Sequence, residues 1–445
     1  MASMRRAIET LIRWLAEALV RLYYPGRSVE GAGRIARDRP VIFVANHPNG
    51  LLDPLLLRVA TGRPARFLAK STLFRNPLGR VAMSAFGSIP VYRAHESSGG
   101  TSRNEESFAR CRAALARHEA LALFPEGVSH SDSQLRPLKT GAARIALSAV
   151  AEHPGALGLQ IVPVGLYYER KALFRSRVLL VIGEALPVAP RLAAYRADER
   201  ASVDALTDEI RTRLDDVVLQ AESRELLAGI ARVARWTGTA QPEDAADLAA
   251  QHRRARELLA AYGRLRARDP ARVDAIAGAA RAYARALQRL GVRDPWALEV
   301  ELVRAAPAAL TLVKLVASLP LAIVGAILGF VPYRLAGRVA RRLTQDEDVL
   351  GTVKMIAGAV FLFVGWSAEA VAVGIHWGAA WSLPTFLLGV GSGYVALRFD
   401  ELVRETAEAI RHLMVRAFHR DIARRLAERR RALAEAVASA LRDAA

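Results

Sequence analysis

The fold of the first half of this chain is decided by residues 41–54, VIFVANHPNGLLDP. The first five residues are all apolar, which is typical of a strand buried on both faces of a sheet. The turn His47-Pro-Asn-Gly50 follows at once, so the strand delivers an imidazole at its end. Asp53, just before a proline, is placed to begin a helix. This order predicts an α/β domain with functional groups in the loops that follow its strands.

Further short apolar runs repeat this pattern along the chain and alternate with helical stretches at Glu105–Ala116 and Lys139–Val150. The apolar runs are Ala65–Ala69, Ile89–Tyr92, Ala120–Phe124, Ile161–Tyr167 and Val178–Ile182. Such alternation predicts a domain over residues 25–195 in which helices flank a central mixed sheet.

Helices are expected to dominate the rest of the chain. Residues 1–24 place apolar side chains at helical spacing among arginines and glutamates, which predicts an amphipathic helix. This helix is either an anchor at a membrane interface or is docked on the core of its own domain. Residues 196–305 are predicted to form a helical region, and residues 398–445 a basic helical tail.

Residues 306–397 are predicted to hold the membrane segments, since 308–331 and 355–396 carry almost no charge. The second stretch is long enough for two passes of about 20 residues, a C-terminal transmembrane helical hairpin. Its predicted spans are residues 355–375 and 378–397. Pro320 and Pro332 are expected to break the first stretch, which is therefore predicted to be re-entrant or interfacial. Arginine-rich flanks predict that the α/β domain faces the cytoplasm.

Composition narrows the possible partners. The chain has 445 residues, and 63 Lys and Arg against 44 Asp and Glu give a net charge of +19. This surplus favours an anionic partner, such as a phosphorylated metabolite, nucleic acid or a lipid surface. The alternative is that the basic side chains only form solvent-exposed faces of the arginine-rich helices. No nucleic acid is expected, because the basic residues are scattered through helices without a recognition motif. Cys111 is the single cysteine, which excludes an intrachain disulfide.

Two loops carry groups suited to acid–base chemistry. His47 can remove a proton from a hydroxyl if a carboxylate such as Asp53 orients its other ring nitrogen. A second strand runs into Phe-Pro-Glu126-Gly127, where the carboxylate could bond a hydroxyl and the backbone amides could face an anion. Both loops contain residues that also occur in ordinary turns, so neither loop alone decides a function.

Cations also stand at predicted strand ends. Lys70 and Arg93 could hold a phosphate, the first as a point charge and the second through its planar fork. Pro163 lies in a buried strand and would shape a pocket wall. The stretch from Gly127 to Ser131 lacks the second glycine of a nucleophile elbow, so a serine hydrolase is unsupported. No zinc motif or phosphate-cradling Gly-Lys-Ser/Thr loop is present, so no metal and no cofactor are expected.

In this order the motifs resemble the four blocks of the glycerolipid acyltransferase superfamily, whose members make lysophosphatidate and phosphatidate. The blocks are Asn46-His47…Asp53, Gly87-Ser-Ile-Pro-Val-Tyr-Arg93, Phe124-Pro-Glu126-Gly127-x-Ser129 and Val162-Pro163-Val164. The chain is most similar to the fungal-type glycerol-3-phosphate and dihydroxyacetone-phosphate acyltransferases. Five residues separate His47 from Asp53, as in that branch, and Asn49-Gly50 can absorb the extra residue in a left-handed turn.

The resemblance implies that His47 is the general base and that Asp53 orients it. The deprotonated acceptor hydroxyl would attack the thioester of acyl-CoA or acyl-acyl-carrier protein. The residues implied to hold the acceptor and its phosphate are Lys70, Arg93, Glu126, Gly127, Arg136 and Lys139, with Asn46, Ser129 and Pro163 supporting the motifs. A lipid product fits contact with membrane lipid, expected at the cell inner membrane.

The acceptor stays open at this point. Glycerol 3-phosphate or its keto analogue, dihydroxyacetone phosphate, is the first expectation and 1-acyl-glycerol 3-phosphate the alternative, because phosphate-binding residues would serve both. The non-enzyme alternative is a scaffold protein at the membrane surface that binds lipid without catalysing a reaction. The presence of both His47 and Asp53 favours the enzyme.

Overall fold

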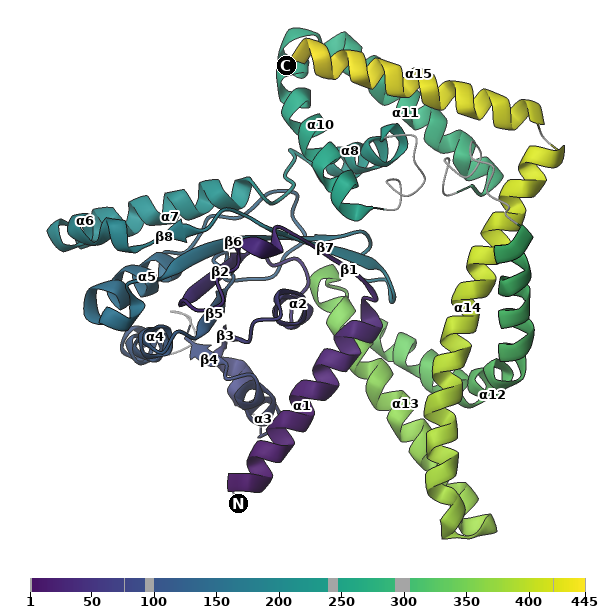
Figure 1. Cartoon of the computed structure of the whole chain (residues 1–445), viewed down its shortest axis with the longest axis horizontal. Coiled ribbons are helices and arrows are strands. Elements are labelled where there is room, and N and C mark those ends of the chain that lie inside the picture. The colour runs from purple at the N-terminus through teal and green to yellow at the C-terminus, as the bar shows by residue number, and fades with distance from the viewer. Residues whose placement is uncertain are drawn as a thin grey trace. The chain divides into compact units, whose positions relative to one another are not determined.

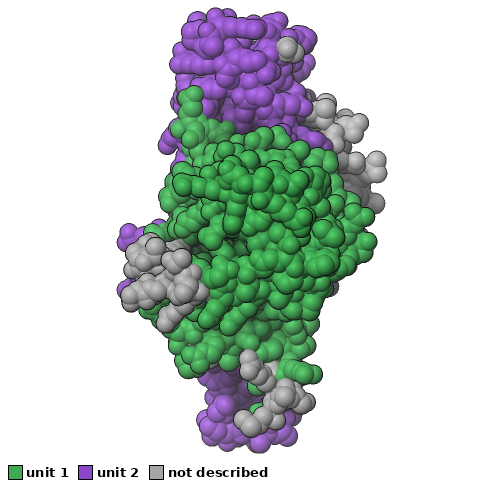
Figure 2. Space-filling view, turned by 90° about the vertical axis from the view of Figure 1, so that its left-hand side faces the viewer, with its two compact units in different colours: residues 1–222, 346–352 green, residues 223–345, 353–445 purple. Residues whose placement is uncertain are grey.

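The computed structural model describes residues 2–75, 77–92, 100–238, 247–292, 305–418 and 420–444, and the chain forms two compact units. The first unit comprises residues 1–222 together with the short segment 346–352 (Figure 2). The second comprises residues 223–345 and 353–445.

The first unit is built on an eight-stranded mixed sheet (Figure 1). Its order is β1-β7-β6-β2-β5-β3-β4, and β8 pairs with β6. The strands are β1 (Gly26–Glu30), β2 (Val41–Ala45), β3 (Ala65–Lys70), β4 (Ile89–Val91), β5 (Ala120–Leu123), β6 (Gln160–Tyr168), β7 (Arg177–Ile182) and β8 (Leu186–Pro187). The strands β2 to β6 all run in one direction, whereas β7 and β8 are antiparallel to β6. The expected mixed sheet is confirmed.

Helices of the first unit bury this sheet. They are α1 (Ala2–Tyr23), α2 (Leu52–Thr61), α3 (Pro77–Ala85), α4 (Gly100–Ala116), α5 (Gly141–Glu152), α6 (Leu192–Ala197) and α7 (Glu199–Asp215). All five residues of β2 are fully buried, as expected for a parallel strand with both faces covered. The predicted boundary at residue 195 falls inside the unit, because α7 buries Leu206, Ile210 and Leu214.

The amphipathic helix α1 is docked on its own unit at one end and exposes apolar side chains toward the other. Its C-terminal end is docked on the unit, where Val20 and Tyr23 are buried and Glu17 pairs with Arg58 of α2 at 3.0 Å. Toward its N-terminus an apolar stripe that includes Trp14 stays exposed. An interfacial role for this stripe stays a prediction.

The second unit contains a bundle of four polar helices. They are α8 (Arg224–Thr237), α10 (Leu248–Arg268), α11 (Pro270–Leu290) and α15 (Arg420–Ala444). Trp236 and Tyr283 pack edge to face with ring centroids 5.2 Å apart. The side chains of Ser223, Asp247 and Asp269 accept hydrogen bonds at the first turns of α8, α10 and α11, which fixes where these helices begin.

Three described helices are long and apolar enough to cross a membrane: α12 (Ala305–Leu343), α13 (Glu347–Trp377) and α14 (Ser382–Phe418, preceded by a short 3₁₀ turn). The expectation that Pro320 and Pro332 end a helix is wrong, because both lie inside the continuous α12. Figure 1 shows that α12 is bent, as interior prolines bend a helix without ending it. The re-entrant or interfacial placement of residues 308–331 stays a prediction.

Candidate active site

The parallel strands bring the predicted site residues to one edge of the sheet. The C-terminal ends of β2, β3, β5 and β6 lie together there, as parallel strands require. His47 follows β2, Lys70 ends β3 and Glu126 follows β5. Arg93 lies outside the described residues. Functional groups that are far apart in the sequence thus meet at this edge.

His47 and Asp53 form the pair expected from the sequence. His47 Nδ1 lies 2.8 Å from Asp53 Oδ2, and the carboxylate is fully buried, whereas the imidazole is 18% exposed. The ring stacks on Phe124 with centroids 4.0 Å apart. With the proton on Nδ1 facing Asp53, Nε2 carries the lone pair, and it makes no hydrogen bond within the part of the chain that the structure describes. The ring is therefore arranged to accept a proton at Nε2.

Asp53 is itself held by groups that the sequence analysis did not find. The backbone N–H of Asn49 donates to Oδ2 at 2.7 Å, and the Tyr168 hydroxyl donates to Oδ1 at 2.5 Å. Burial, followed by the neighbouring Asp53 charge, raises the pKa of Tyr168 well above its usual value, so the phenol stays a donor. The Asn49 side chain in turn donates to the Tyr24 hydroxyl at 2.8 Å. Both carboxylate oxygens of Asp53 are thus fixed.

The local sequence explains why this loop folds as it does. Gly50 has a φ of 45°, a left-handed value, as expected for this turn. The N–H of Asp53 then donates to the Gly50 carbonyl at 3.3 Å and α2 begins. Asp53 lies in the first turn of α2, where the helix dipole favours a negative charge.

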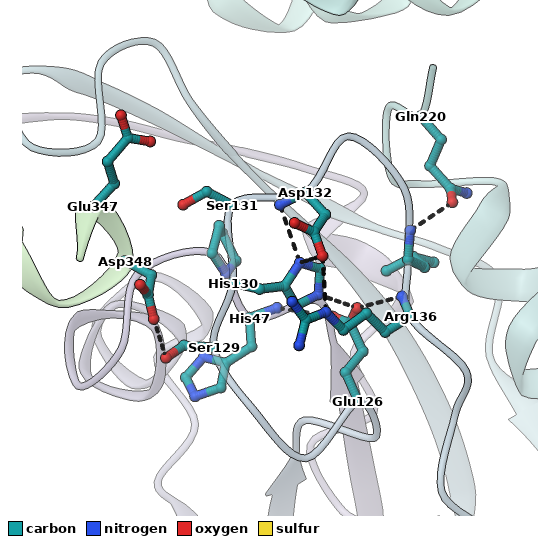
Figure 3. Close-up of polar contacts among 12 residues, drawn as sticks. His47, Glu126, Ser129, His130, Ser131, Asp132, Arg136, Gln220, Glu347 and Asp348 are labelled. Atoms are coloured by element: carbon teal, nitrogen blue, oxygen red, sulfur yellow. Dashed lines mark hydrogen bonds and ion pairs between the residues drawn. The ribbon is translucent and has the colours of Figure 1, made fainter. Parts of the chain in front are cut away.

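Glu126 joins the loop after β5 to the loop of His47 (Figure 3). Its side chain is fully buried. Oε1 accepts from the His47 N–H at 3.3 Å, and Oε2 accepts from the Arg136 N–H at 2.8 Å and contacts His130 Nε2. The His130 N–H donates to the His47 carbonyl at 3.1 Å. The backbone of His47 is therefore held on both sides, and the role of Glu126 toward glycerol stays a prediction.

The other residues predicted from the motifs are also placed. Gly127 has a φ of 75°. The Lys139 side chain lies close to it, and a Cβ on Gly127 would be 2.7 Å from Lys139 Nζ. Arg136 Nε pairs with Asp132 at 2.8 Å. Asn46 exchanges two hydrogen bonds with the backbone of Leu166, at 3.2 and 2.7 Å, and so ties β2 to β6.

Further cations and carboxylates surround this edge. Pro163 pairs with Val44 in the sheet and is buried. Lys171, which sequence reasoning missed, places Nζ 3.4 Å from the Pro48 carbonyl and contacts Ser131 Oγ. Ser129 Oγ donates to Asp348 Oδ2 at 2.5 Å (Figure 3). Within the described ranges, no group of three or more His, Cys, Asp or Glu side chains could hold a metal ion.

Comparison with known proteins identifies the domain that carries this geometry. Residues 26–167 match the family model described as Acyltransferase. These residues are an acyltransferase domain. The superfamily expected from the four motifs, and the similarity to glycerol-3-phosphate acyltransferases, are thereby confirmed.

Relatives of the acyltransferase domain come from several organisms. An uncharacterized acyltransferase of Schizosaccharomyces pombe is 26% identical over 63% of this chain and 54% of its own length. Glycerol-3-phosphate O-acyltransferase 1 of Saccharomyces cerevisiae is 34% identical over 27% of this chain and 16% of its own length. The chloroplastic 1-acyl-sn-glycerol-3-phosphate acyltransferase BAT2 of Brassica napus is 27% identical over 43% of this chain and 48% of its own length. The chain thus spans about half, or less, of these relatives.

Proposed function

We propose that this protein is a membrane-bound O-acyltransferase. It moves a fatty acyl group from a thioester, acyl-CoA or acyl-acyl-carrier protein, to a hydroxyl of glycerol 3-phosphate or dihydroxyacetone phosphate, in phosphatidic acid and phospholipid synthesis. The observation that carries the proposal is the buried Asp53 that orients His47 inside an acyltransferase domain and leaves Nε2 without a hydrogen bond in the described residues.

The chemistry follows from this geometry. His47 Nε2 takes the proton of the acceptor hydroxyl as the oxygen attacks the thioester carbonyl. The C–S bond of the tetrahedral intermediate then breaks, and the imidazolium returns its proton to the leaving thiolate. Asp53 stays ionised throughout and stabilises the imidazolium. The transfer is direct, so no cofactor takes part in it.

The acceptor phosphate is proposed to bind among the cations at the same sheet edge. Lys70 and Lys139 are exposed there, and charge-assisted hydrogen bonds to phosphate oxygens are strong. Arg93 and Arg136 complete the proposed phosphate site. The loop of Glu126 and Gly127 positions the glycerol.

A second acceptor, 1-acyl-sn-glycerol 3-phosphate, is supported by the Brassica napus relative, whose name states that acceptor. Both acceptors carry the same phosphate and a free hydroxyl. A lipid-binding scaffold without activity would not need the orientation of His47 by a buried carboxylate. The membrane contact is assigned to the apolar helices, with the acyltransferase domain on the cytoplasmic side of the inner membrane.

The direct test incubates membranes that contain the protein with labelled acyl-CoA or acyl-carrier protein and each acceptor in turn. We expect labelled lysophosphatidate, or its keto analogue, with wild type and none with His47→Ala. Labelled phosphatidate made only from the monoacyl acceptor would select the second acceptor. Absence of a lipid product with every pair of substrates would refute the proposed acyltransferase activity.

A further inference from the structure

The first turn of α13 lies inside the acyltransferase unit. Although α13 is apolar and long enough to cross a membrane, its start clusters with residues 1–222, in the segment 346–352. Asp348 accepts the hydrogen bond from Ser129, and Glu347 Oε2 lies 4.0 Å from Lys171 Nζ. Figure 3 shows both acidic side chains beside the loop that carries Ser129. A helix of the membrane region therefore contributes side chains to the loops around His47.

Gly351 in the α13 turn and Gly50 in the loop after His47 let the backbones of these two segments approach closely. A Cβ on Gly50 would lie 3.0 Å from the Asp348 carbonyl oxygen. A Cβ on Gly351 would lie 2.8 Å from Asn49 Oδ1 and 3.3 Å from the Lys171 carbonyl oxygen. These distances are shorter than ordinary contacts of about 3.5–4.0 Å. The turn and the loop fit together because neither glycine carries a side chain.

Two short series of contacts connect this turn to His47 and Asp53. Ser129 immediately precedes His130, whose N–H donates to the His47 carbonyl. Asn49, whose side-chain oxygen would lie 2.8 Å from a Cβ on Gly351, donates its N–H to Asp53 Oδ2. The turn therefore touches one loop that holds the backbone of the base and one that holds its carboxylate.

We propose that residues 346–352 are a positioning element of the acyltransferase site, with Asp348 acting as a positioning residue through Ser129. This inference rests on the proposed function and adds to it a dependence of turnover on the membrane anchor. Docking of the α13 turn keeps His47 and Asp53 in the orientation for proton transfer. Because Asp348 acts through Ser129, its loss lowers kcat and leaves KM for both substrates nearly unchanged.

A double-mutant cycle tests the contact directly. We expect Asp348→Ala and Ser129→Ala each to lower kcat about 10- to 100-fold, because each removes a hydrogen bond to a charged group. The double variant should be no slower than the slower single variant, and Asp348→Asn, which retains an acceptor oxygen, should recover to within about fivefold of wild type. Independent, multiplicative losses, or a raised acceptor KM with unchanged kcat, would overturn the proposal.

A glycine pair in the same helix provides the matched control. Gly351→Ala introduces a methyl group against Asn49, whereas a Cβ on Gly358 meets nothing within 4 Å. We expect kcat to fall at least about 10-fold in Gly351→Ala and to stay at the wild-type value in Gly358→Ala. Equal activity of the two variants would contradict a role for the close approach.

Hydrogen–deuterium exchange of the full chain in lipid nanodiscs separates this inference from the proposed function. Peptides covering residues 46–53 and 126–131 should exchange faster in Asp348→Ala and Gly351→Ala than in wild type, and Gly358→Ala should match wild type. If no acceptor is acylated, the proposed function fails while these exchange rates still decide the positioning role. Unchanged exchange in both variants would overturn it.

Discussion

Replacing Asp53 by Asn tests the assignment of His47 as the base. The carboxylate accepts from three donors: the ring of His47, the N–H of Asn49 and the hydroxyl of Tyr168. An amide has one oxygen and one NH₂ group, so it cannot serve all three in the same way. If the NH₂ faces Tyr168, the phenol can turn to accept, and His47 keeps its tautomer but loses the neighbouring charge. If the NH₂ faces His47, the proton moves to Nε2 and the base is lost.

The size of the effect follows from these two arrangements. Loss of the charge alone removes a charge-assisted bond of about 1.5–3 kcal/mol, or about 10- to 150-fold in rate. The wrong tautomer costs about 10⁴-fold in a serine-protease triad. We therefore expect kcat of Asp53→Asn to fall by about 10- to 10⁴-fold, with little change in KM for the acceptor.

The assay measures steady-state acyl transfer by purified protein in lipid vesicles, with the thermal midpoint as a check on folding. Asp274→Asn is the control, since Asp274 is 69% exposed and its ion pair with Arg266 contributes little. Turnover by folded Asp53→Asn above about a tenth of wild type would refute the reasoning.

Three further outcomes can be checked separately. Lys70→Ala and Arg93→Ala should each raise the acceptor KM about 10- to 150-fold and the donor KM far less, because each removes a charge-assisted bond to phosphate. Equal increases in the two KM values, measured with isotope-labelled substrates, would contradict a phosphate site. Gly165→Ala should lower the thermal midpoint by several degrees relative to Gly33→Ala. A Cβ on Gly165 would lie 2.0 Å from the Val217 carbonyl oxygen, whereas a Cβ on Gly33 meets nothing within 4 Å. Equal midpoints of the two variants would argue against this packing. Burial raises the pKa of Cys111 to about 12, so a maleimide at pH 8 should modify it only after unfolding, and rapid labelling of native protein would disprove its burial.

Local patterns predicted most of the sheet and the centre of the site. The six predicted strands form where the apolar runs lie: β2, β5 and β7 are buried along almost their whole length, whereas β3 and β4 are only partly buried. β1 was missed because its sequence, GRSVE, is short and polar. His47 and Asp53 lie in one strand–loop–helix segment, so their pairing could be predicted from their spacing. The sequence also predicted where the long apolar helices lie, but prolines did not mark their ends.

Contacts made by tertiary folding could not be predicted in this way. Tyr168 reaches Asp53 across 115 residues of sequence, and Asp348 reaches Ser129 across 219. Both residues occur in ordinary surroundings, one at the end of an apolar strand and one at an acidic helix start, where a charge or phenol has simple structural explanations. Only the folded arrangement shows that Tyr168 bonds Asp53 and that Asp348 bonds Ser129.

The docking of residues 346–352 also limits how the chain can pass through a bilayer. Two segments of one compact unit lie on the same side of a membrane, so the chain between residues 222 and 346 must cross an even number of times or not at all. In the described part of that interval α12 is the apolar helix, and one complete crossing by it would violate this parity. A bent α12 that begins and ends on the cytoplasmic side satisfies the parity. We therefore expect an impermeant thiol reagent on intact cells to label a cysteine placed near residue 378, but none near 300, 340 or 440; labelling near both 300 and 378 would break the parity.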